Sequence, residues 1–225
     1  MKVKDFANSK WMILLELALA MLFLFGANIF KIIPVSETPF IVLLAWISLR
    51  LRGAKWSSLG FSKQKNWTRT ILIGLGIAVG IQVLSTFVTE PALTRITGTP
   101  TDLSSFEPIV GNLPVAAIYF VVIWTLAAFG EEISYRGFIL NRMVELGGNT
   151  RAAWILGILI HAVLFGVGHF YQGLTGMVDT GMTAMTLGIA YWFSRKNLWI
   201  CVFAHGFSDT IGLAIVYFDW VKYLK

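Results

Sequence analysis

The sequence predicts an all-α fold, a polytopic transmembrane helix bundle with about seven spans and six to eight as the range. Three observations predict it. Hydrophobic residues make up 56% of the 225 residues. Charged residues make up only 13%, whereas an ordinary soluble domain carries about 25%. The apolar residues also gather into runs close to the roughly 20 residues that cross a bilayer as a helix. This composition excludes a soluble enzyme, a disordered chain and a nucleic-acid-binding domain.

Seven apolar runs follow one another along the chain. The second is short, so it can extend at either end or fail to span fully. The sixth is interrupted by Asp179 and several glycines, so it can be re-entrant or tilted. The first is interpreted as a retained anchor, because its nominal signal-peptide cleavage site lies inside the run, and Glu16 within it predicts a polar contact between helices. The seven runs are Trp11–Phe30, Pro39–Leu49, Thr70–Val88, Leu113–Phe129, Ala152–Phe170, Gly176–Phe193 and Leu198–Phe218.

The distribution of basic residues indicates an orientation. The loop from Arg50 to Arg69 carries six basic residues and no acid. If this loop is cytoplasmic, alternation through seven spans adds eight more on the same side, so 14 of the 18 Lys and Arg residues face the cytoplasm. The positive-inside rule favours such an excess. We therefore expect a multi-pass protein of a bacterial plasma membrane with a cytoplasmic N-terminus. The polar stretch from Glu90 to Asn112 is expected to be an extracytoplasmic loop.

Residues that carry chemistry concentrate in the second half of the chain. Residues 1–112 are expected to hold N-terminal transmembrane helices and the extracytoplasmic loop without a motif. Residues 113–213 hold the motifs, and 214–225 the end of the last helix and a short tail. All three histidines, His161, His169 and His205, fall within apolar runs. An ionisable side chain in a bilayer costs about 2.5–3.5 kcal/mol by insertion scales, so it usually marks function.

The first cluster, Glu131 to Arg136, lies at the cytoplasmic end of the fourth run. In a helix Glu132 and Arg136 are one turn apart and can form an ion pair. Glu131 would then be an unpaired carboxylate, able to act as a general base. The alternative, an interfacial charge cluster that closes a helix, is equally compatible with this cluster alone.

The other two clusters also follow a helical spacing. His161, Phe165 and His169 recur every four residues and share one face, although His161 alone is interpreted as a hydrogen-bonded core residue. His205 and Asp209 are one turn apart, and an Asp near the middle of a span requires a partner. Cys201, the single cysteine, is interpreted as a small buried hydrophobe outside the site.

The predicted topology separates two of these clusters in depth. Glu131 would lie near the cytoplasmic face, whereas His169, late in an outward-going helix, would lie nearer the other face. The two can still meet if the fifth or sixth segment is broken, or if the helix that contains Glu131 is submerged within the bilayer.

Together the three clusters resemble the three-motif signature of the CAAX-protease and bacteriocin-processing (CPBP) intramembrane proteases. The motifs are Glu131-Glu132-x-x-x-Arg136, Phe165-x-x-x-His169 and His205-x-x-x-Asp209, and the resemblance covers about residues 113–213. It implies that Glu131 activates the attacking water and that Arg136 holds Glu132. His169, His205 and Asp209 would complete the polar centre. The third motif of this family often ends in Asn, so an oxyanion-donating role does not carry over to Asp209 unless it is protonated.

Two versions of the chemistry remain open. In one, Glu131 takes a proton from water, and a histidine with a second donor stabilises the oxyanion. In the other, Glu131, His169, His205 and Asp209 gather a divalent metal such as zinc, which would activate the water. Both make the protein an intramembrane endopeptidase that acts on membrane-associated CAAX-like or bacteriocin-like peptides. Its partners would then be membrane lipids and a peptide or protein substrate, with no nucleic acid.

Two other function classes fit the same residues. One is a non-catalytic membrane protein that confers bacteriocin immunity or binds a partner, with the motifs as structural polar contacts. The other is an ion-coupled transporter, because intramembrane Glu, His and Asp also suit proton relays. The lack of a detectable internal repeat weakens the transporter.

Overall fold

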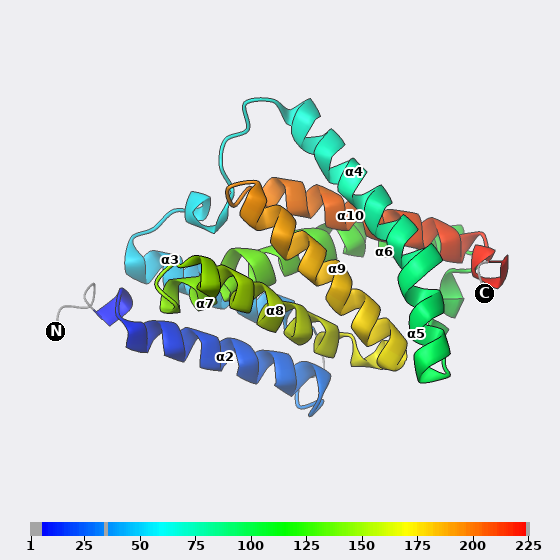
Figure 1. Ribbon diagram of the computed structural model, residues 1–225, viewed down its shortest axis with the longest axis horizontal. Coiled ribbons are helices and arrows are strands. Elements are labelled where there is room, and N and C mark those ends of the chain that lie inside the picture. Colours follow the sequence, from blue (N-terminus) through cyan, green and yellow to red (C-terminus); the bar gives the residue numbers. More distant parts are fainter. Residues whose placement is uncertain (1–5, 34–35, 224–225) are drawn as a thin grey trace.

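The computed structural model describes residues 6–33 and 36–223, and these residues are helical with no strand (Figure 1). The bundle agrees with the predicted fold class. Its α-helices are α2 Lys10–Asn28, α3 Thr38–Arg52, α4 Trp67–Leu84, α5 Glu90–Thr97, α6 Leu113–Val122, α7 Asn141–Leu146, α8 Arg151–Gly168, α9 Gly173–Phe193 and α10 Leu198–Tyr217. Short 3-10 segments are η1 Trp56–Leu59, η3 Ser104–Ile109, η5 Phe170–Gln172 and η6 Trp220–Tyr223, and π-helical segments are η2 Ser85–Thr89 and η4 Ile123–Leu140.

Two of the helices are longer than the apolar runs predict. Through η2, α4 continues into α5 as one helix of 31 residues, Trp67–Thr97. The expectation of a loop from Glu90 was therefore wrong for its first eight residues, which form α5. Through η4, α6 continues into α7 as one helix of 34 residues, Leu113–Leu146, which we call the motif helix.

Five helices are long and apolar enough to cross a membrane among the described residues. They are Lys10–Asn28, Trp67–Thr97, the motif helix, Arg151–Gly168 and Leu198–Tyr217. The second and sixth apolar runs also form helices, α3 and α9, but neither is among the five, and α3 has only 15 residues. The sequence left open whether these two runs cross the membrane, because the second is short and the sixth is interrupted.

Side chains of capping residues mark where many helices begin. An N-cap oxygen that accepts a backbone N–H satisfies one of the donors left free at the first turn. Asn66, for example, accepts from the amide of Arg69 at 2.9 Å at the start of α4. Ser9, Asn112, Thr150 and Asn197 cap α2, α6, α8 and α10 in the same way.

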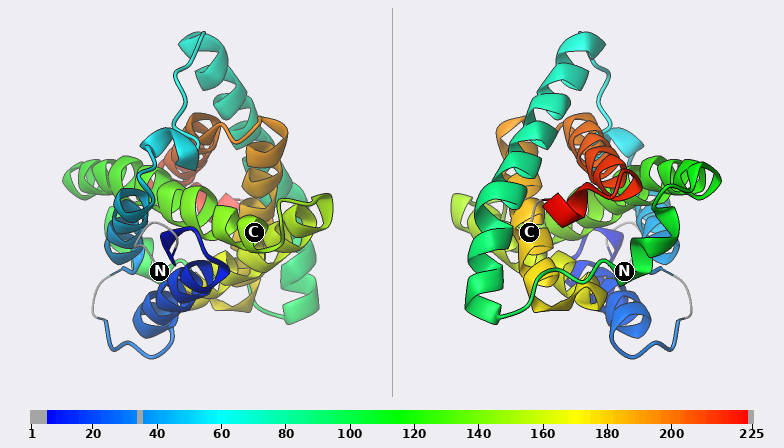
Figure 2. Two further views of the ribbon diagram at one scale, coloured as in Figure 1. Left: turned by 90° about the vertical axis from the view of Figure 1, so that its left-hand side faces the viewer. Right: turned by 90° about the vertical axis from the view of Figure 1, so that its right-hand side faces the viewer.

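The motif helix crosses the middle of the molecule, with α2 and α4 on different sides of it (Figure 2). Its π-helical part is the centre of the core: Gly130 and every residue from Glu132 to Leu140 are buried. Helices α3 and α10 pack directly against this part, and α9 packs against α8. The motif residues therefore lie in the protein interior, where neighbouring helices rather than lipid surround them.

Glu16 makes the expected polar contact between helices. Its Oε2 accepts from Nη2 of Arg52 of α3 at 2.8 Å and forms an ion pair with Nε of Arg142 of α7 at 3.0 Å, and both arginines also pair with Glu145. This network joins α2 and α3 to the end of the motif helix. Of the basic residues used for orientation, Lys2, Lys4 and Lys225 lie outside the described residues.

Candidate active site

Glu131 and Glu132 lie near the middle of the motif helix, not at the end of a span. The placement of the cluster at the end of the fourth run, and the alternative that it closes a helix, were wrong, because the helix continues for ten residues beyond Arg136 to Leu146. The charges do not end it, since Glu132 and Arg136 neutralise one another within the protein. The structure brings this cluster against α10, which carries His205, and close to α8, which leads to His169. A long π-helical stretch often marks a functional part of a helix.

Glu132 is a fully buried acceptor shared by two partners. Its Oε1 accepts from Nη1 of Arg136 at 2.7 Å and lies 2.8 Å from Nδ1 of His205. Arg136 is equally buried; its Nη2 donates to the carbonyl of Ala184 at 3.3 Å, and its guanidinium lies 4.7 Å from the centre of the Phe165 ring. This ion pair therefore links the motif helix to α8, α9 and α10.

His205 stands among three carboxylates. Its Nδ1 faces Glu132, while its Nε2 lies 3.4 Å from Asp209 and 4.0 Å from Glu131. Because a carboxylate accepts only, Nδ1–H is the donor to Glu132. The ring is thus fixed from one side, and its Nε2 is directed at the space between Asp209 and Glu131.

Glu131 differs from its neighbour Glu132. Its side chain is 19% exposed, and its Oε2 has no hydrogen-bond partner in the described part of the chain. The nearest cationic group that pairs with it is His205, at 4.0 Å. Glu131 is therefore the partly exposed carboxylate without a close partner, next to Glu132, whose position Arg136 and His205 fix.

His169 joins this site through Phe165 rather than by a direct bond. Its Nδ1 lies 2.9 Å from the carbonyl of Phe165, and the two rings stack with centres 4.9 Å apart. The Phe165 ring in turn meets His205 with centres 6.1 Å apart. Among the described residues no hydrogen bond or ion pair connects His169 with the other motif side chains. The geometry thus brings Glu131, Glu132, Arg136, His205 and Asp209 into one connected cluster and places His169 at its aromatic edge.

His161 is buried one turn before Phe165, beside the Tyr135 ring at 6.0 Å. It was expected to be a hydrogen-bonded core residue. Its burial agrees with the expectation of a core residue. Cys201 is a buried free thiol, as expected.

Three polar residues near the site were missed by the motif analysis. Glu37, at the start of α3, accepts from the hydroxyl of Tyr135 at 2.7 Å and from the amide of Asn28 at 3.0 Å. Glu37 could have been singled out as an isolated acid between two apolar runs. Tyr135 and Asn28 carry no such signal, because neither is ionised and their spacing to Glu37 follows no helical period.

The set Glu131, His169, His205 and Asp209 was the candidate metal site. Within residues 6–33 and 36–223, no group of three or more His, Cys, Asp and Glu side chains is arranged to hold a metal ion. The Nδ1 atoms of both histidines are engaged, with Phe165 and with Glu132, which leaves each Nε2 as the nitrogen that could bind a metal. As they are placed here, however, the four side chains do not form a metal site.

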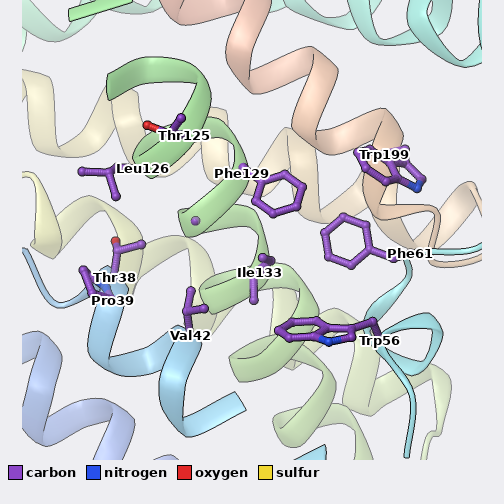
Figure 3. A pocket seen from close by; sticks show the side chains of 11 residues that line it. Thr38, Pro39, Val42, Trp56, Phe61, Thr125, Leu126, Phe129, Ile133 and Trp199 are labelled. Carbon is purple, nitrogen blue, oxygen red and sulfur yellow. The ribbon is translucent and has the colours of Figure 1, made fainter. Parts of the chain in front are cut away.

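A cavity lies elsewhere on the motif helix. It has a volume of about 420 Å³ and lies between α3, η1, η4 and the start of α10 (Figure 3). Its walls are almost entirely apolar and include none of the motif acids or histidines. The residues that line it are Thr38, Pro39, Val42, Trp56, Phe61, Thr125, Leu126, Phe129, Gly130, Ile133 and Trp199. The polar cluster, rather than this cavity, is the candidate active site.

Residues 113–211 match the family model described as Rce1-like, type II CAAX prenyl endopeptidase Rce1-like. The matched segment contains all three motifs, from Glu131 to Asp209. The match confirms the family resemblance that the motifs predict, and with the apolar helices it supports an integral membrane protein of CAAX-protease type. Comparisons with curated proteins and with solved structures found no match.

Proposed function

We propose that this protein, which carries a CAAX endopeptidase segment at residues 113–211, is an intramembrane endopeptidase in which Glu131 activates water. One observation carries the proposal: the two adjacent glutamates differ in their partners. Glu132 is fully buried and held by Arg136 and His205 at 2.7 and 2.8 Å, whereas Glu131 is 19% exposed and has His205 only at 4.0 Å. A general base needs a free carboxylate oxygen within reach of water.

The reaction then follows in two steps. Glu131 accepts a proton from a water molecule, and the water oxygen attacks the scissile carbonyl carbon to form a tetrahedral oxyanion. The proton passes from Glu131 to the amide nitrogen as the C–N bond breaks. The products are a carboxylic acid and an amine, and Glu131 returns to its carboxylate form.

His205 is the proposed oxyanion donor. With Nδ1–H donated to Glu132, a protonated Nε2–H directed at the space between Asp209 and Glu131 can donate to a developing negative charge. Asp209 supports the orientation and charge of His205. In the dry interior of a helix bundle such a donor contributes more than it would in water.

His169 has a different proposed role. Because the carbonyl of Phe165 accepts only, the Nδ1 of His169 is the protonated nitrogen. The Nε2 of the neutral ring then carries a lone pair, which can accept a hydrogen bond from the attacking water or from a substrate N–H. We therefore assign His169 to binding of water or substrate rather than to the oxyanion.

The substrate is proposed to be a peptide anchored in the membrane, of the CAAX-like or bacteriocin-like kind. The family match implies a membrane-associated peptide or protein as substrate. The position of the acids near the middle of a long membrane helix supports a scissile bond that is reached from within the membrane or at its boundary.

The test compares wild-type protein with the Glu131→Gln variant in proteoliposomes. The probe is a quenched fluorescent peptide that ends in a prenylated cysteine followed by three residues. We expect loss of cleavage in the variant with an unchanged thermal unfolding profile in detergent. Cleavage at the wild-type rate by Glu131→Gln would refute the mechanism. Metal content measured on the same wild-type preparation tests the metal-assisted version directly.

A further inference from the structure

We propose that Glu37, which lies outside the matched segment, is a positioning residue of this site that acts through Tyr135. The inference rests on the proposed endopeptidase function. Its basis is a chain of contacts that runs from the N-terminal helices to His169. The three motifs do not include the first residues of this chain, Asn28 and Glu37.

Glu37 joins three helices through its two carboxylate oxygens. Oε1 accepts from the hydroxyl of Tyr135 on the motif helix at 2.7 Å, and Oε2 accepts from Nδ2 of Asn28 at the end of α2 at 3.0 Å. Glu37 itself precedes the first residue of α3. One side chain therefore fixes the end of α2 and the start of α3 against the part of the motif helix that carries the acids.

The carboxylate is held in the interior without a cation. Glu37 is 7% exposed, and no Lys, Arg or His of the described ranges lies within 4.0 Å to form an ion pair with it. Burying a charge is costly, and two neutral donors offset only part of that cost. The position of Glu37 therefore depends on its two hydrogen bonds, from Tyr135 and Asn28.

Tyr135 carries the effect of Glu37 to His169. The Tyr135 ring meets Phe165 edge-on, with centres 4.7 Å apart, and Phe165 stacks on His169 at 4.9 Å. Phe165 also supplies the carbonyl that binds Nδ1 of His169. A Tyr135 ring without its anchor would leave Phe165, and with it His169, free to shift.

The end of α8 approaches this anchor closely. A Cβ atom on Gly168, the residue before His169, would lie 3.3 Å from the Tyr135 hydroxyl and 3.9 Å from Oε1 of Glu37. The last turn of α8 therefore packs close to the paired Tyr135 hydroxyl and Glu37 carboxylate. Both the aromatic contacts and this backbone contact place His169 relative to Glu37.

The test is a double-mutant cycle in which kcat and KM are measured for the wild type and for each variant. The variants are Glu37→Ala, Tyr135→Phe and the double variant, measured with the same prenylated peptide in proteoliposomes. We expect each single variant to lower kcat by about tenfold or more, since small misplacements of a reacting group have effects of this size, with KM nearly unchanged. The double variant should be no slower than the slower single variant, because both remove one interaction. Additive losses would overturn the proposal.

Two further variants separate positioning from general loss of stability. Tyr191→Phe is the matched control, because it also removes a buried tyrosine hydroxyl, which bonds Asn141 and Leu59 away from the site. It should lower the unfolding temperature and leave kcat unchanged. Glu37→Gln keeps an acceptor for Tyr135, so it should rescue kcat to within about threefold of wild type. A Glu37→Gln variant as slow as Glu37→Ala, or a Glu37→Ala variant as fast as Tyr191→Phe, would refute positioning through Tyr135.

The same assay distinguishes failure of this inference from failure of the proposed function. If Glu131→Gln is inactive and Glu37→Ala has wild-type kcat, only the role of Glu37 is refuted. If Glu131→Gln cleaves normally, the proposed mechanism fails first, whatever Glu37 does.

Discussion

Nδ1 of His205 lies 2.8 Å from the same oxygen of Glu132 that accepts from Arg136 at 2.7 Å. One fully buried carboxylate thus fixes both the arginine of its own helix and the imidazole of α10. The other oxygen of Glu132 has no partner among the described residues. This arrangement makes Glu132 the support of the site and leaves the reaction itself to Glu131.

The first prediction separates these two glutamates. Glu132→Gln removes the negative charge opposite the buried Arg136, and breaking a buried pair from one side costs about 3–5 kcal/mol. We expect a lower unfolding temperature and loss of cleavage, whereas Glu131→Gln should lose cleavage alone. Thermal unfolding in detergent, followed by helical circular dichroism, checks the difference. Equal stability of the two variants would contradict the division of roles.

The second prediction concerns Asp209, where the family often has Asn. Its side chain is 35% exposed and lies 3.4 Å from Nε2 of His205. Asp209→Asn keeps the size of the side chain and supplies an amide that can donate to an oxyanion. We expect it to retain cleavage within about tenfold of wild type, since one hydrogen-bonded group changes. Asp209→Ala, which supplies neither charge nor donor, should be slower than Asp209→Asn. The reverse order of rates would show that the negative charge itself is required.

Much of the fold follows from local properties of the sequence. Each apolar run became a helix, and the four-residue spacing of Glu132 and Arg136 gave a real ion pair. The end of the fourth run was misplaced because a charge cluster usually marks an aqueous boundary. Here Glu132 and Arg136 pair with one another inside the bundle, and His205 of α10 also contacts Glu132, which local spacing does not reveal. The contact of Glu37 with Tyr135 spans 98 positions of sequence, so no periodicity could predict it.

The third prediction tests the aromatic edge of the site. Phe165→Leu preserves an apolar side chain but removes the stacking on His169, the edge contact with Tyr135 and the contact with the Arg136 guanidinium. Aromatic pairs contribute about 0.5–1.5 kcal/mol each beyond area burial, and cation–π contacts about 0.5–2 kcal/mol. We expect a moderate loss of unfolding free energy and a lower kcat.

The control for that variant is Phe193→Leu, because Phe193 is 79% exposed at the end of α9 and touches none of the site residues. It should leave both stability and kcat near wild type. A Phe165→Leu variant that behaves like the control would mean that His169 keeps its position without the ring.

The fourth prediction concerns the close approach of α8 and α9, which places the histidine-bearing helix. A Cβ on Gly166 would collide with the carbonyl oxygen of Met177, and it would lie 3.4 Å from the backbone of Gly181. Small residues let membrane helices approach to backbone contact, and overpacking such a contact costs about 1–3 kcal/mol. Gly166→Ala should therefore lower the unfolding temperature by separating α8 from α9. Gly76→Ala is the matched control, because a Cβ there meets no atom within 4 Å and alanine favours a helix interior by about 0.8–1.0 kcal/mol. A stability of Gly166→Ala equal to that of Gly76→Ala would show that the two helices are not packed this closely.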